Sequence, residues 1–138
     1  TSRTTKAKLQ KGATLIVREK LMTHGDQVAE TYFEVNMDGK DCSAHLVSRS
    51  VAKDRSKQVF TSVMNGNARC NGRSECDAII MDHAKVLALP ALNAETKDAE
   101  LIHEAAIGKL ASDQLTKLMT LGLTQSQAES KIINGFLQ

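Results

Sequence analysis

The side chains best suited to chemistry in this chain are concentrated in two short segments. Residues 72–82 (Gly-Arg-Ser-Glu-Cys-Asp-Ala-Ile-Ile-Met-Asp) contain Cys76, and residues 102–109 (Ile-His-Glu-Ala-Ala-Ile-Gly-Lys) contain His103 and Glu104. A thiolate and an imidazole suit soft and borderline metal ions, and carboxylates lie close to both in the sequence. These residue types therefore predict metal or sulfur binding of modest specificity.

Each of these residues also has a purely structural interpretation. Cys76 shares one face of a predicted strand with Ala78 and Ile80, and most cysteines in such a setting are buried and inert. His103 fits a packed position in which a hydrogen bond satisfies its ring. His103 and Glu104 are neighbours on a predicted strand, so their side chains point to opposite faces. They cannot act as a local ligand pair.

Other known site patterns are missing from the sequence. The spacing from Cys70 to Cys76 matches neither a zinc ribbon nor a ferredoxin. There is no phosphate-binding glycine-rich loop, no serine nucleophile elbow and no His-Glu-x-x-His motif. We therefore expect that the protein is not an enzyme. Three cysteines are an odd number without a dense framework, which favours reduced thiols and a cytoplasmic location.

Length and composition limit the remaining classes. The 138 residues suit one domain with a real core, built from aliphatic and small side chains because aromatics make up 3%. A net charge of +2 gives no reason to expect nucleic acid or a membrane as a partner, and no apolar run approaches the roughly 18 residues that span a bilayer. The chain opens at Thr1 in a strand-like pattern, so we expect it to be part of a longer protein.

Short strands separated by turn residues fill the region before the C-terminal tail. They are predicted at residues 13–17, 28–35, 43–51, 58–64, 76–81, 85–89 and 100–106. Steps of about a dozen residues suit a β-sandwich or a solenoid of stacked coils, and the sequence does not decide between them. Apolar residues on both faces, as in Ile79-Ile80-Met81, follow naturally if one face fills a solenoid interior. Pro90 is expected at the end of its strand.

The tail changes to a helical period and predicts a hairpin of two short helices. Ser112 is a good N-cap for the first helix, which Gly122 ends, and Thr124 with Gln127 forms a capping box for the second. Neither helix is long enough to be stable alone, so the pair must pack on the sheet or on a partner. The apolar stripe of the hairpin consists of Leu115, Leu118, Ile132 and Ile133.

Residues 75–82 and 103–109 resemble the SufB/SufD family of iron–sulfur cluster assembly scaffolds. The similarity continues through Asp113-Gln114-Leu115, Gly122-Leu123-Thr124 and the closing Ile-Ile-Asn-Gly-Phe at 132–136, whereas residues 1–60 fit only by their strand rhythm. The resemblance implies a right-handed parallel β-helix over residues 1–108 and a small helical domain over residues 109–138. Both agree with the predicted strands and hairpin.

The resemblance also implies roles and partners. Cys76 and Glu104 correspond to residues implicated in holding a transient iron–sulfur cluster, and His103 to one implicated at the scaffold interface. The implied partners are a SufC-type ABC ATPase docked on the helical part, a second scaffold subunit (self or a SufB/SufD homologue) and a cysteine desulfurase system as the sulfur donor. The chain departs from the SufB form at Ala106 and Ile107, which replace two threonines, and in an aromatic-rich stretch that is missing after Gln114.

Three hypotheses follow. The first is a non-enzymatic scaffold that holds a nascent cluster through Cys76, Glu104 and His103 at an interface between protomers, because His103 and Glu104 diverge. The second is a docking and dimerisation module for the ATPase that ligates no cluster and uses the Leu115/Leu118/Ile132/Ile133 stripe. The third is a β-helix enzyme acting on carbohydrate, which the scarcity of substrate-stacking aromatics disfavours.

Overall fold

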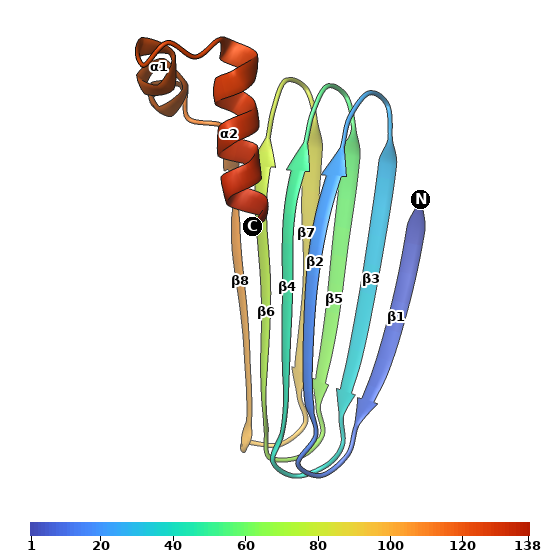
Figure 1. The fold of residues 1–138 in the computed structure, drawn as a ribbon. Helices are drawn as coiled ribbons and strands as arrows, with labels where there is room; N and C mark the ends of the chain where they lie inside the picture. Colours follow the sequence, from blue (N-terminus) through green and yellow to red (C-terminus); the bar gives the residue numbers. More distant parts are fainter.

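The computed structural model describes residues 1–138 as a stack of long parallel strands with two helices near one end (Figure 1). The strands are β1 (Ser2–Leu9), β2 (Thr14–Thr23), β3 (Val28–Met37), β4 (Cys42–Ala52), β5 (Lys57–Gly66), β6 (Cys70–Ile80), β7 (Lys85–Ala94) and β8 (Ala99–Lys109). The helices are α1 (Ser112–Thr120) and α2 (Gln125–Leu137).

Successive strands alternate between two parallel sheets. One sheet has the order β1-β3-β5-β7 and the other β2-β4-β6-β8, so each coil contributes one strand to each sheet. Hydrogen bonds between equivalent residues of adjacent coils span 28 or 29 positions. The predicted parallel β-helix followed by a helical hairpin is therefore confirmed, and the sandwich alternative is wrong.

The interior of the solenoid follows from strict alternation along each strand. In β4 the side chains of Cys42, Ala44 and Leu46 are buried, whereas those between them are partly exposed. The inward residues of successive coils stack into one apolar cluster, and the rings of Phe33 and Phe60 lie 5.9 Å apart between centroids. Apart from these two rings, the interior takes small and unbranched or aliphatic residues, close to what the composition predicted.

Polar ladders tie the coils together on the outside. The side-chain amide of Asn65 donates to Asn36 Oδ1 at 2.8 Å, and that of Asn93 donates to Asn65 Oδ1 at 2.8 Å. At the turns, Arg69 pairs with Asp41 on the preceding coil at 2.8 Å. The three asparagines are spaced one coil length apart along the chain, so identical residues at equivalent positions bond to one another.

Three features of the strands differ from the predictions. β1 lies where the chain opens in a strand-like pattern, but Ser2–Leu9 was not among the strands given a range, because it alternates small residues with Arg3, Lys6 and Lys8 rather than with a strong apolar face. β6 begins at Cys70, so the predicted strand at 76–81 is only its second half. Pro90 lies inside β7 rather than at its end. This is tolerated because β7 is an edge strand of its sheet, where a missing N–H group costs no ladder bond.

The ends of the helices only partly match the predictions. The N-cap of α1 is Ala111, without a side-chain cap, and Ser112 is the first helical residue, so the cap predicted at Ser112 is wrong. Gly122 follows α1 with a φ of +93°, and Thr124 forms the predicted capping box with Gln127. The hairpin then returns to the solenoid.

Helix α2 packs against the C-terminal ends of β4 and β6. Ile133 is buried against Val51 and Met81, with Ile79 beside them. The guanidinium of Arg49 donates to the backbone oxygen of Gln138 at 3.1 Å. The helix is therefore part of the packed structure and not a free appendage.

Candidate functional site

Cys76 lies on β6 inside the solenoid. It is 1% exposed, and its register neighbours are Ser48 on the preceding coil and Ala105 on the following one. Burial, followed by the nearby carboxylates Asp77 and Glu19, raises the pKa of its thiol to about 11. The side chain is therefore a neutral thiol at neutral pH, and binding a metal must displace its proton.

His103 faces the same interior from β8, in the last coil. It pairs in register with Ser74, two residues before Cys76 on β6, so the imidazole and the thiol occupy diagonal positions on one interior surface. Both ring nitrogens are buried without a hydrogen-bond partner, and burial lowers the pKa of the ring. A buried polar group without a partner costs about 1–3 kcal/mol. This imidazole is thus neutral and has unused bonding capacity.

Glu104 points to the outside, as the alternation along the strand predicted. Its Oε2 accepts a hydrogen bond from Arg73 Nη2 at 2.7 Å, and the same guanidinium pairs with Glu75 at 2.5 Å. His45 Nε2 lies 3.0 Å from Glu75 Oε1, and this hydrogen bond, with further help from Arg73, lowers the pKa of Glu75. The Glu104 carboxylate is therefore engaged in an ion-pair network on the outer face.

Within one chain, the structure brings together only two of the three predicted ligands. Cys76 and His103 share the interior, whereas Glu104 lies on the other side of the β8 backbone. No group of three or more His, Cys, Asp and Glu residues is placed to hold a metal ion. One chain therefore does not bring the three predicted ligands together, and ligation across an interface stays a prediction.

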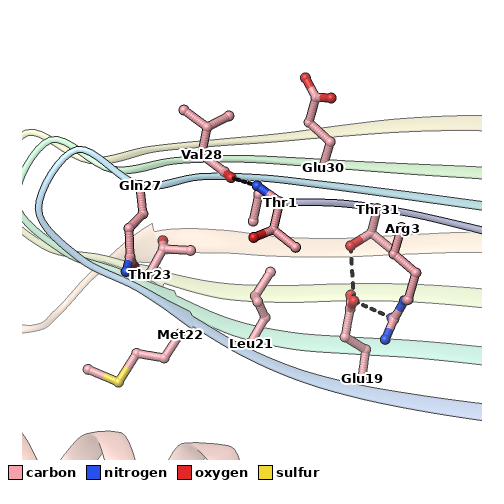
Figure 2. Close-up of a pocket in the computed structure, with 11 residues that line it drawn as sticks. Thr1, Arg3, Glu19, Leu21, Met22, Thr23, Gln27, Val28, Glu30 and Thr31 are labelled. Atoms are coloured by element: carbon pink, nitrogen blue, oxygen red, sulfur yellow. Dashed lines mark hydrogen bonds and ion pairs between the residues drawn. The ribbon is translucent and has the colours of Figure 1, made fainter.

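A buried carboxylate that sequence reasoning missed lies in the same row of the interior as Cys76. Glu19 accepts hydrogen bonds from Ser48 Oγ at 2.8 Å, Thr31 Oγ1 at 3.0 Å and Arg3 at 2.5 Å. Figure 2 shows Arg3 and Thr31 converging on Glu19. These three side chains line a hollow of about 440 Å³ at the β1 end of the solenoid. The sequence signal that could have found it is strand alternation, because Glu19 shares the inward face of β2 with Leu15 and Val17.

The hairpin stripe is only partly available for a partner. Ile133 is buried, whereas Leu115, Leu118 and Ile132 are half-buried. The most exposed apolar residues of the hairpin are Leu121, at 80%, and Met119, at 45%, and neither belongs to the predicted stripe. No helix of the structure is long and apolar enough to cross a membrane.

The fold and the site together define a β-solenoid protein with a thiol and an unpartnered imidazole inside its last coils. Residues 2–136 match the family model described as "SUF system FeS cluster assembly, SufBD core domain". The chain belongs to this SufBD family, as its resemblance implied. Family membership connects it with iron–sulfur cluster assembly.

Curated relatives support this assignment. The chain is 34% identical over 114 residues to an iron–sulfur cluster assembly SufBD family protein of Methanothermobacter thermautotrophicus, covering 81% of this chain and 28% of the relative. It is 31% identical over 132 residues to a protein of the same description from Pyrococcus horikoshii, covering 95% and 40%. A relative from Archaeoglobus fulgidus is 28% identical over 133 residues, covering 96% and 36%. The chain thus spans well under half the length of these relatives.

Proposed function

We propose that this chain is the part of a SUF scaffold that holds a nascent iron–sulfur cluster and docks a SufC-type ATPase, without catalysing a reaction itself. The observation that carries the proposal is the His103 ring, which has no hydrogen-bond partner and faces the interior beside Cys76 in a SufBD-family chain. An imidazole and a thiolate suit iron and sulfide. The cluster is cargo that the protein receives and hands on.

The burial of both groups suits transient holding. The Cys76 thiol must lose its proton when it ligates, so cluster release is favoured whenever that proton returns. His103 lies in the last coil, which has a neighbouring coil on one side only. A second protomer that covers this coil supplies further ligands in the proposal, including its own Glu104. The proposal also includes a cytoplasmic location and a cysteine desulfurase as the sulfur donor.

Anaerobic reconstitution with iron and sulfide tests the cluster-holding role. We expect Cys76→Ala and His103→Ala to lose most of the iron and sulfide that the parent chain takes up. Cys70→Ala is the matched control, because Cys70 is an equally buried thiol on the same strand, 2% exposed. Equal uptake by the parent and Cys76→Ala would rule out Cys76 as a required ligand.

Docking of the ATPase is assigned in this proposal to the exposed end of the hairpin, around Leu121 and Met119. Deleting residues 111–138 is a poor test, because it also removes the buried Ile133 from the solenoid. We expect Leu121→Asp to weaken a pulldown of the ATPase, whereas Ser126→Asp, an exposed change in the first turn of α2, leaves it intact. Full binding by Leu121→Asp would exclude this surface.

The second candidate function, a docking module that ligates no cluster, is distinguished by the same pair of experiments. It requires that Cys76→Ala and His103→Ala take up as much iron as the parent while Leu121→Asp fails to bind the ATPase. The exposed apolar residues of the hairpin favour this alternative, whereas the unpartnered imidazole does not.

A further inference from the structure

A group of basic side chains lies on the outer face of the β2-β4-β6-β8 sheet, on the opposite side of the strands from the interior. Arg18 and Lys20 alternate with the inward Glu19 on β2, so both point outward. Arg49 pairs in register with Lys20 and lies between the inward residues of β4. The pairing between coils thus gathers three permanent cations from two neighbouring strands on one surface.

These cations share a hollow of about 420 Å³. The residues that line it are Arg18, Glu19, Lys20, His45, Val47, Arg49, Glu75 and Gln138. The side chain of Glu19 is directed into the interior, where Ser48 and Thr31 donate hydrogen bonds to it. Glu75 is therefore the one carboxylate that faces the hollow, against three cations.

That carboxylate is already engaged by other groups. Glu75 Oε1 lies 2.5 Å from Arg73 Nε and 3.0 Å from His45 Nε2. Arg73 is not part of the lining of the hollow, so its charge offsets that of Glu75 from outside. The positive charge of the three lining cations is thus left without a counterion from this residue.

The cations themselves have bonding capacity to spare. Arg18 and Lys20 take part in none of the ion pairs of the structure. A guanidinium has five N–H donors, and that of Arg49 makes one hydrogen bond, from Nη1 to the backbone oxygen of Gln138 at 3.1 Å. Asp77, the register neighbour of Arg49 on β6, does not line the hollow. Several charged donors therefore remain free to bind an anion.

We propose that this hollow binds a phosphate group. Like charges directly opposite one another on paired strands, as Lys20 and Arg49 are, destabilise a sheet, and a bound anion removes that repulsion. The planar fork of an arginine binds two phosphate oxygens at once, and a lysine adds a compact charge. The volume suits a small ligand. The phosphate is either free or part of a nucleotide, because both present the same oxygens.

Titration with pyrophosphate at constant ionic strength, followed by ¹H–¹⁵N NMR, tests the proposal. We expect one saturable site, with the largest shifts at the amides of residues 18–20 and 45–49. The double change Arg18→Gln with Lys20→Gln is expected to weaken binding by at least about tenfold, because it removes two charged contacts. Both side chains are exposed, and the amide spectrum also shows whether the variant is folded.

Lys57→Gln with Lys85→Gln is the matched control. These two exposed lysines pair in register on β5 and β7 of the other sheet, so the control removes the same charge from another like-charged pair. We expect it to keep the pyrophosphate affinity of the parent. Comparison with ADP identifies the source of the phosphate. Tighter binding of ADP assigns a nucleotide and tighter binding of pyrophosphate assigns a free phosphate, and either result supports the proposal.

Three results would overturn it. The first is the absence of saturable binding by both pyrophosphate and ADP. The second is an equal loss of affinity in the two double variants, which would mean that only net charge matters. The third is saturable binding of an oligoglutamate peptide by a chain that binds neither phosphate compound, which would assign the surface to an acidic protein segment. None of these results depends on cluster holding, because no iron or sulfide is present in the titration.

Discussion

Burial sets the protonation state of both interior residues of the proposed site. It raises the pKa of the Cys76 thiol to about 11 and lowers the pKa of His103. Desolvation disfavours the charged form of each group, which is the thiolate for cysteine and the imidazolium for histidine. The two side chains therefore lie at diagonal positions on one interior surface as neutral groups, and a metal bound between them would bring a charge into an otherwise uncharged part of the interior.

The His103 shift predicts a pH dependence of stability. The pKa of His103 is lower in the folded chain than the ordinary value of 6.5, so below this pH the unfolded chain binds the extra proton first. Stability is therefore complete above pH 6.5 and falls as the pH decreases. We expect His103→Gln to flatten the change in unfolding free energy between pH 7.5 and 5.5, measured by urea denaturation.

His24 offers the control for this prediction, because it lies exposed in the turn between β2 and β3. We expect His24→Gln to leave the pH dependence of the parent chain unchanged. A parent and a His103→Gln chain with parallel stability profiles would show that the burial of His103 contributes nothing.

At the scale of the elements, the two helices differ in how their first turns are capped. The side chain of Thr124 accepts a hydrogen bond from the backbone of Gln127, whereas Ser112 lies inside α1 and caps nothing. We expect Thr124→Ala to lower the free energy of unfolding by about 1 kcal/mol and Ser112→Ala to change it by less than about 0.5 kcal/mol. Urea denaturation measures both, and equal losses would contradict the assigned caps.

The asparagine ladder makes a second prediction at this scale. Asn65 takes part in two ladder hydrogen bonds, one with Asn36 and one with Asn93, whereas Asn93 takes part in one. A hydrogen bond contributes about 0.5–1.5 kcal/mol, so Asn65→Ala is expected to cost about twice as much stability as Asn93→Ala. Equal costs in chemical denaturation would mean that the ladder does not act as a chain of bonds.

Local patterns predicted the type of most elements but not how they pair. The alternation in Ser43–Val51 and the capping box at Thr124 depend on neighbouring residues, and the structure agrees with both. The choice between sandwich and solenoid depends on the repeat between coils. That repeat was readable in Asn36, Asn65 and Asn93, whose side chains bond over 29 and 28 positions.

The candidate site likewise has features that local patterns predict and features that depend on the pairing between coils. Strand alternation alone predicted that His103 and Glu104 diverge. The capture of Glu104 by Arg73, 31 positions away, follows from the register between coils, which no local pattern contains. The same is true of Cys42 and Cys70, whose Cα atoms pair in register. Sequence reasoning thus placed side chains on faces, whereas the structure supplied their neighbours.

At the scale of the whole molecule, successive coils lie so close together that one turn has no room for a side chain. The Cβ of any residue at position 39 would overlap the backbone of Lys11, in the preceding coil. We expect Gly39→Ala to destabilise the chain by about 3 kcal/mol or more. Gly135→Ala is the control, because position 135 is open and helical, so alanine there is expected to stabilise α2 by up to about 1 kcal/mol. Thermal denaturation of both variants tests the contrast, and a Gly39→Ala chain as stable as the parent would contradict it.

The repeated ladder between coils also makes the molecule modular. Each coil offers the next the same parallel backbone edge, so a tandem copy of residues 42–69 adds one strand to each sheet without disturbing the register of the others. The longer protein gains about 4.8 Å along the stacking axis. It also places a third cysteine in line with Cys42 and Cys70, which turns a single pair of thiols into a row whose length is set by the number of coils.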